Sequence, residues 1–191
     1  LKTRRNEIKD QIFCVVDIET SGGINSGQII EIGALKLQNG EIIGKFETFV
    51  YAPYVPENIS ELTGITAEHL KNAPSLAFVM EQFKVFLGQS VFVAHNVRFD
   101  YGFISATLEA LGYGELLNRK LCTIDLARRT IASQKYGLDS LKELLGIHNA
   151  HHRALNAAIS ASEILKYAFT KLPFSVQTTE DLIKFSKSAP S

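Results

Sequence analysis

The chain has 191 residues, 46% of them hydrophobic and 21% charged, which is enough for one domain with a sizeable buried core. Its 20 lysine and arginine residues balance 20 aspartates and glutamates, so the formal charge is zero. This balance argues against a broad basic surface that coats nucleic acid, but it leaves room for an enzyme that holds a few nucleotides and uses metal ions at the phosphate.

Two further features concern the cellular compartment. No apolar run approaches the ~18 residues of a membrane span, and the charged N-terminus at 1–5 has no apolar signal core behind it. Cys14 and Cys122 lie in apolar, strand-like runs and are expected to be reduced core thiols. We therefore expect a cytoplasmic protein without membrane contact, and the start at Leu1 indicates a fragment.

The first half of the chain predicts an antiparallel meander behind an N-terminal arm at 1–11. The unbroken apolar run at 12–18 (IFCVVDI) is typical of a strand buried on both faces, and 28–37 (QIIEIGALKL) predicts a second strand. Asn39-Gly40 is a strong hairpin signal, so 41–51 is predicted to be the return strand.

The second half alternates between strands and helices. A turn with a short helix is expected within 56–71. Strands are predicted at 90–94 and 120–124, and helices at 75–87, 98–111, 125–132, 138–145 and 153–171. Strand–helix–strand alternation implies parallel strands with crossover helices. The predicted fold class is therefore α/β, with a mixed five-stranded sheet of three antiparallel and two parallel strands flanked by helices.

The stretch at 174–191 is polar and is predicted to be a tail or linker that follows a domain at 12–173. The part at 177–185 (QTTEDLIKF) has some likeness to a sliding-clamp-binding peptide. A short helix capped at Thr178 or Thr179 is the preferred interpretation, since threonine is a common N-cap residue.

Two carboxylates mark the end of the first predicted strand. Asp17 and Glu19 are two residues apart, so in a strand they point to the same face. Two neighbouring carboxylates repel each other when they are buried, and a bound cation relieves this, with Mg²⁺ or Mn²⁺ favoured by oxygen ligands. Solvated acids at a strand end explain the pair equally well.

Two later clusters contain candidate site residues. His95 and Asn96 follow the buried strand SVFVA, and Asp100 lies in the first turn of the next predicted helix, where an acid could simply balance the helix dipole. That explanation does not account for the His-Asn pair at the strand exit, where sites gather in parallel α/β proteins. His151 and His152 precede a helix rich in small residues.

Together these motifs resemble the DEDD exonuclease superfamily, in the branch with a catalytic histidine. The resemblance rests on VVDIETSG at 15–22 with IIEIGAL at 29–35, AHNVRFD at 94–100, and HHRALNAA at 151–158. LTGIT at 62–66 and LCTIDLARRT at 121–130 are similar to polymerase-associated members, such as the epsilon subunit of DNA polymerase III.

The resemblance implies a 3′→5′ exonuclease that hydrolyses phosphodiester bonds with two metal ions. Asp17, Glu19 and Asp100 would be metal ligands, and His152 the general base, a role that suits a group titrating near neutrality. Candidates to hold the terminal nucleotide are Thr20, Leu62, His95, Asn96 and Phe99, although Leu62 and Phe99 could be ordinary core residues. The expected partners are single-stranded DNA 3′ ends and a DNA polymerase catalytic subunit.

The third motif departs from the family pattern, in which an aspartate follows the histidine by five positions. Here that position is Ala157. Glu163 is the only acid between Leu144 and Thr179, and it lies about 240° further round the helix, so it should face elsewhere. The fourth carboxylate is therefore missing. Because the other motifs, including His152, are intact and a natural pseudoenzyme would be free to lose them, an engineered inactivating change is favoured.

Two other functions remain open. One is an RNA 3′ exonuclease of the RNase T or oligoribonuclease type, because 2′-hydroxyl recognition depends on a few contacts that the motifs do not define. The other is a non-catalytic domain that binds 3′ ends or serves as a scaffold, which Ala157 supports. LTGIT and the polar 174–191 segment favour DNA proofreading.

Overall fold

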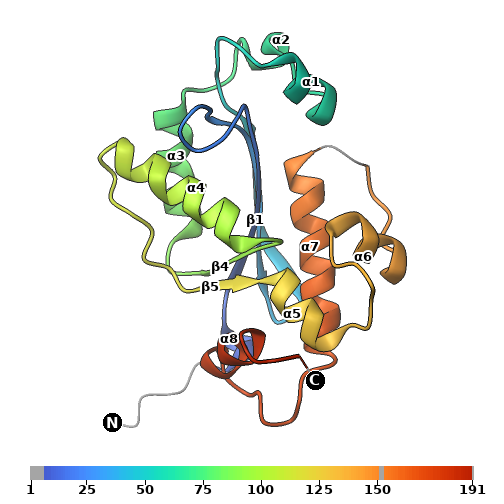
Figure 1. Ribbon diagram of the computed structural model, residues 1–191. Helices are drawn as coiled ribbons and strands as arrows, with labels where there is room; N and C mark the ends of the chain where they lie inside the picture. Colours follow the sequence, from blue (N-terminus) through green and yellow to red (C-terminus); the bar gives the residue numbers. More distant parts are fainter. Residues whose placement is uncertain (1–6, 151–152, 191) are drawn as a thin grey trace.

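A five-stranded sheet forms the centre of the computed structural model, which describes residues 7–150 and 153–190 (Figure 1). Its strands, in the spatial order β3-β2-β1-β4-β5, are β1 (Phe13–Thr20), β2 (Ile29–Gln38), β3 (Glu41–Phe49), β4 (Val91–Ala94) and β5 (Lys120–Cys122). Strands β1, β2 and β3 pair antiparallel, whereas β4 pairs parallel with both β1 and β5. The predicted mixed sheet, with the Asp17 strand at its centre, is confirmed.

Eight α-helices and one short 3-10 helix are present in the described residues. They are η1 (Ile8–Asp10), α1 (Glu57–Thr63), α2 (Ala67–Leu70), α3 (Leu76–Leu87), α4 (Val97–Ala110), α5 (Thr123–Thr130), α6 (Leu138–Leu145), α7 (Ala154–Phe169) and α8 (Thr179–Ser186). None of the helices in the described ranges is long and apolar enough to cross a membrane.

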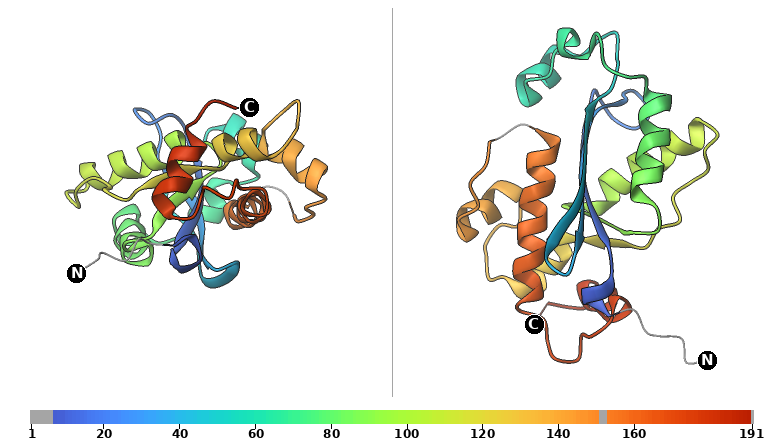
Figure 2. Two further views of the ribbon diagram at one scale, coloured as in Figure 1. Left: turned by 90° about the horizontal axis from the view of Figure 1, so that it is seen from below. Right: turned by 180° about the vertical axis from the view of Figure 1, so that it is seen from behind.

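The helices form a layer on each face of the sheet. Figure 2 shows α3 and α4 on one side and α7 on the other. Alternate β1 residues divide accordingly, since Val16 packs in the core cluster with α3 and α4, and Val15 in the cluster with α5, α7 and α8. Both cysteines are free thiols, with Cys14 buried and Cys122 half-buried. Asp17 and Glu19 share the parity of Val15 and therefore lie on the α7 face.

Local signals account for most element boundaries. Asn39 and Gly40 both have positive φ, at 51° and 80°, as a two-residue hairpin turn of this type requires. Ser75 accepts a hydrogen bond from the Phe78 amide and caps α3, and Gly146 ends α6 in the left-handed conformation. Helix α5 begins at Thr123, two residues earlier than predicted. The pairing of β5 with β4 ends at Cys122, so the chain is free to turn there.

The segment after α7 packs on the domain. The polar composition predicted a tail, whereas Thr178 caps helix α8, as the capping interpretation expected, and Leu182 is fully buried. The Glu180 side chain forms an ion pair with Arg119. The backbone of Thr178 forms an isolated antiparallel β-bridge with Glu7, just before η1. The sequence alone did not indicate this packing, because Val176, Leu182 and Phe185, which contact the core, are scattered among polar residues.

The Leu182→Ala variant should lose stability. Leu182 is 0% exposed and packs in the cluster beneath α7, so its truncation leaves a cavity that costs about 2–5 kcal/mol. The matched control is Phe174→Ala, because the Phe174 side chain is 92% exposed. Urea unfolding followed by circular dichroism should show a lower midpoint for Leu182→Ala alone. Equal midpoints for the two variants would show that α8 does not pack as observed.

Candidate active site

The central carboxylates project from β1 toward α7. In the antiparallel register, Asp17 lies opposite Gly33 and Glu19 lies opposite Glu31 on β2. Residues directly opposite in such a pair point to the same face. Asp17, Glu19 and Glu31 therefore bring three acids to one patch of the sheet.

Asp100 approaches the same patch from the first turn of α4. Its side chain is 4% exposed, and Oδ2 accepts a hydrogen bond from the backbone N–H of Ile18 at 3.2 Å. Strand β4 is short, and its pairing with β1 ends at Val15, so on that side of β1 no strand competes for the Ile18 amide. The bond attaches Asp100 to the residue between Asp17 and Glu19, close enough that the Asp100 charge raises the pKa of Asp17 and the Glu19 charge raises that of Asp100.

Ala157 shares a cavity with Glu19. The cavity has a volume of about 130 Å³, and its other lining residues are Leu138, Asp139, Lys142, Asn149, Ala150 and Arg153. The side chain of residue 157, on the first turns of α7, thus lies across this cavity from Glu19. Glu163 does not, because it pairs with Lys166 at 3.3 Å and its side chain is 44% exposed. The expectation that Glu163 faces elsewhere agrees with this geometry.

Burial and mutual repulsion dominate the electrostatics. Burial, followed by the negative charges of Asp100 and Glu19, raises the pKa of Asp17 well above its usual range. Burial also raises the pKa of Asp100 to about 8 and that of Glu19 to about 7, with like-charge contributions from Glu19 and Glu31 respectively. No lysine or arginine of the described residues offsets these upward pKa shifts.

The acidic patch fits a cation. Asp17 Oδ2 is completely buried and has no hydrogen-bond partner among the described residues, which is costly unless another group contacts it. Within the part of the chain that is described, no three histidine, cysteine or carboxylate side chains are gathered tightly enough to form a ready metal site. A cation would have to draw the carboxylates together, and the absence of a carboxylate at Ala157 leaves one side of the patch open.

The candidate nucleotide contacts fall into two groups. Leu62 on α1 is 68% exposed and Phe99 on α4 is 46% exposed, so neither is an ordinary core residue. Asn96 is also exposed and adopts φ of 78° at the start of α4, and Thr20 is half-buried at the end of β1. Thr20, Asn96 and Phe99 are accessible near the C-terminal ends of β1 and β4, whereas Leu62 is exposed on α1.

The His95 ring is engaged within the protein. Its Nε2 donates to the Tyr136 carbonyl at 2.8 Å, and its Nδ1 lies 2.7 Å from the Thr123 hydroxyl. Burial lowers the pKa of His95, which favours a neutral ring whose Nδ1 accepts from the Thr123 hydroxyl. His95 therefore links β4 to the start of α5 and offers no free nitrogen to a nucleotide in this arrangement. His152, the expected general base, lies outside the described residues.

Three charged residues near the patch were missed in the sequence. Asp139 and Lys142 come from α6 and line the cavity beside Ala157. Glu31 is 2% exposed, and its signal was its place inside the apolar run IIEIGAL, because a buried acid needs a partner. No spacing rule joined α6 to the other motifs, so its contribution depended on the tertiary fold.

The family match agrees with this geometry. The exonuclease family known as RNase T matches residues 14–165, which contain β1 through most of α7. The chain therefore belongs to this family, which is part of the DEDD exonuclease superfamily.

Particular relatives are PolC-type DNA polymerases III of staphylococci. The chain is 42% identical to PolC-type DNA polymerase III of Staphylococcus epidermidis over 176 residues, and 41% identical to that of Staphylococcus aureus over 171 residues. These alignments cover 89% and 86% of this chain. The chain spans only 12% of the length of either relative.

Solved exonucleases share the fold. Exonuclease X in complex with 5′ overhanging duplex DNA superimposes with a TM-score of 0.67 at 23% identity, covering 91% of this chain and 99% of that one. Exonuclease I gives a TM-score of 0.77 at 16% identity, covering 92% of this chain and 43% of that one. A zinc-bound complex of Escherichia coli exonuclease I with single-stranded DNA gives 0.77 at 17% identity, covering 86% and 42% respectively. The RNase H-like exonuclease fold is thus confirmed.

The raised pKa values predict an unusual pH dependence. The folded metal-free protein keeps protons on Glu19 and Asp100 up to pH of about 7 and 8, whereas unfolded carboxyls release them near pH of about 4. This contribution to stability is present at low pH and is lost as the pH rises toward 8. The melting temperature in EDTA should therefore fall between pH 5 and 8 more steeply than in excess Mn²⁺.

The Asp100→Asn variant is the control for this prediction. It keeps the shape of the side chain but has no proton to lose, so its melting temperature in EDTA should depend less on pH. Identical pH slopes for Asp100→Asn and the starting protein would contradict the assigned cause.

Proposed function

We propose that this domain is a 3′→5′ exonuclease that removes nucleotides from DNA 3′ ends, in the proofreading role of a replicative DNA polymerase. The observation that carries the proposal is the mutual repulsion of the Asp17, Glu19 and Asp100 carboxylates, with Ala157 lining the same cavity as Glu19. The identity to PolC-type polymerases supports DNA as substrate and a polymerase as partner.

Asp17, Glu19 and Asp100 would hold Mg²⁺ or Mn²⁺, two ions per site when a carboxylate stands at position 157. Such ions supply charge neutralisation at the phosphate and lower the pKa of the attacking water. Asp17 is the best placed to contact both ions, because its Oδ2 has no partner among the residues described. His152 would accept the proton of the nucleophile.

Exposed apolar and polar side chains would hold the terminal nucleotide. Phe99 and Leu62 offer surfaces on which a base and sugar can pack, a mode that is tolerant of sequence. Asn96 and Thr20 supply polar contacts at the ends of the strands. His95 would act indirectly, by fixing the strand exit through Thr123 and Tyr136.

Ala157 makes this chain a catalytically impaired form of the enzyme that still binds 3′ ends weakly. A chain with zero formal charge gains little from phosphate neutralisation, so its affinity for DNA should depend only mildly on salt. Sustained residence on DNA would require a polymerase partner.

Initial rates of the Ala157→Asp variant on DNA and RNA oligomers of one sequence test the proposed substrate. Labels at the 5′ or 3′ end report polarity, and chromatography identifies the expected nucleoside 5′-monophosphates. We expect non-processive degradation from 3′ ends with DNA preferred. A clear preference for RNA would assign the protein to the RNase T or oligoribonuclease type. Absence of cleavage on either substrate, with Mg²⁺ or Mn²⁺ present, would favour the scaffold function.

A further inference from the structure

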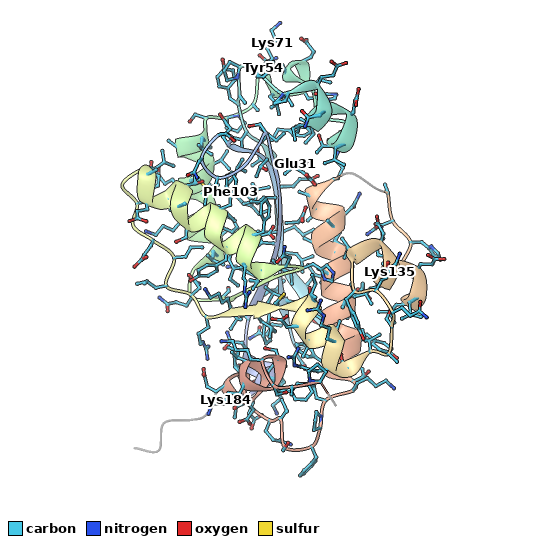
Figure 3. All side chains as sticks on the ribbon, viewed as in Figure 1. Glu31, Tyr54, Lys71, Phe103, Lys135 and Lys184 are labelled. Atoms are coloured by element: carbon cyan, nitrogen blue, oxygen red, sulfur yellow. The ribbon has the colours of Figure 1, made fainter. Side chains whose placement is uncertain are left out.

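Glu31 is a buried acid whose carboxylate is bound by the start of α7. Oε1 accepts a hydrogen bond from the Ala154 backbone N–H at 2.9 Å, and Oε2 lies 3.8 Å from Nη1 of Arg153. The Arg153 guanidinium in turn lies over the Phe49 ring, 4.9 Å from its centroid. Figure 3 labels Glu31 close to the first turn of α7. Both carboxylate oxygens of Glu31 thus face donors of the protein.

This contact replaces a local helix cap. The N-cap residue of α7 is Arg153, and its side chain makes no capping hydrogen bond within the described part of the chain. The first amides of a helix need an acceptor, which is usually a serine, threonine or aspartate at the N-cap. Here the acceptor comes from β2, 123 residues earlier in the sequence.

The first turn of α7, which Glu31 binds at Arg153 and Ala154, also contains residue 157. The Ala157 amide donates to the Arg153 carbonyl at 3.1 Å, so residues 153 and 157 are joined by the first helical turn. Glu31 also lies in register with Glu19, which shares the cavity with Ala157. A shift of residues 153 and 154 away from Glu31 would therefore move the side chain of residue 157 relative to Glu19.

We propose that Glu31 is a positioning residue that sets where the side chain of residue 157 stands over the acidic patch. It contributes to cation affinity through that side chain and is not itself a ligand. This inference rests on the proposed function only in taking position 157 as a ligand position.

A double-mutant cycle tests the coupling. Glu31→Ala, Glu31→Gln and Glu31→Asp are each made alone and together with Ala157→Asp, and Mn²⁺ affinity is measured by isothermal titration. Glutamine keeps an acceptor oxygen for the Ala154 amide but loses the charge. Alanine loses both, and aspartate keeps the charge on a side chain that is too short by one methylene.

Combined with Ala157→Asp, we expect Glu31→Ala to lower Mn²⁺ affinity about tenfold more than Glu31→Gln does, since residues that orient ligands contribute on this scale. With Ala157 retained, the two substitutions should lower Mn²⁺ affinity equally. Both remove the Glu31 charge, and residue 157 then has no ligand whose position could matter. Glu31→Asp should lower Mn²⁺ affinity in the Ala157→Asp protein although the charge remains. This variant also tests the proposal if Glu31→Ala does not fold. Glu47→Ala, which removes an exposed acid from β3, is the matched control.

Two results would overturn the proposal. In the first, Glu31→Ala lowers Mn²⁺ affinity more than Glu31→Gln does, and by the same factor with Ala157 as with Asp at position 157. This would make Glu31 a direct ligand. The second is no difference between the two substitutions in either background. The titration uses neither DNA nor turnover, so an Ala157→Asp protein that binds Mn²⁺ more tightly but cleaves nothing would count against the proposed function alone. Unchanged Mn²⁺ affinity in that protein would overturn position 157 as a ligand, and the positioning role with it.

Discussion

The Ala157→Asp substitution should raise exonuclease activity by at least about 10³-fold over the chain as it stands. The reason is that removal of one essential group from a catalytic set that acts as a unit lowers kcat by about 10⁴–10⁶. Residue 157 already lines the cavity beside Glu19, so a carboxylate there needs no rearrangement of the sheet. Release of nucleotide from a 3′-labelled DNA oligomer with Mg²⁺ measures the gain.

Asn156→Asp is the matched control for this gain. It adds the same charge one residue earlier on α7, about 100° round the helix, and asparagine and aspartate have nearly the same shape. Only the Ala157→Asp protein should become active. Equal activity in both variants would show that a general increase in negative charge, and not a ligand at position 157, is responsible.

The sequence predicted the sheet well because its signals were local. A continuous apolar run defined β1, and Asn39-Gly40 fixed the hairpin through two positive φ values. The parity of Asp17 and Glu19 followed from strand geometry alone. Element ends were less certain, as at α5, because the length of β5 depends on where its pairing with β4 ends.

Site residues could be predicted from the sequence only where they are acids that lie within a recognisable motif. Asp17, Glu19 and Asp100 lie in recognisable motif positions, and their charges act on one another in the structure. Lys142 and Asp139 reach the cavity from α6, which no spacing in the sequence connects to β1. The hydrogen bond of His95 Nε2 joins it to Tyr136, 41 residues away, so it could not be predicted from the sequence either.

The backbones of β2 and α7 lie very close to each other at Gly33. Gly33 lies opposite Asp17, and a Cβ added to it would stand 2.1 Å from the Leu155 amide nitrogen and 2.5 Å from the Ala154 carbonyl carbon. Both of these atoms belong to the backbone, so no side-chain rotation relieves the overlap. Gly33 is therefore what allows the start of α7, and with it position 157, to lie against the carboxylates.

Gly33→Ala should therefore destabilise the protein by at least about 3 kcal/mol, the upper part of the usual range for overpacking. For a chain of this length, that corresponds to a fall in melting temperature of roughly 6–12 °C. In the Ala157→Asp background the same substitution should also remove most of the restored activity, because α7 can only accommodate the methyl group by moving away from Asp17.

Gly102→Ala is the control, since it adds the same methyl group inside α4, where a Cβ meets no atom within 4 Å. It should leave stability unchanged or raise it by about 0.5–1 kcal/mol, because alanine is the better helix former. Thermal unfolding by calorimetry compares the two variants directly. If Gly33→Ala melts as high as Gly102→Ala, β2 and α7 are not in backbone contact at Gly33, and the cavity that joins Glu19 to Ala157 would have to be wider than observed.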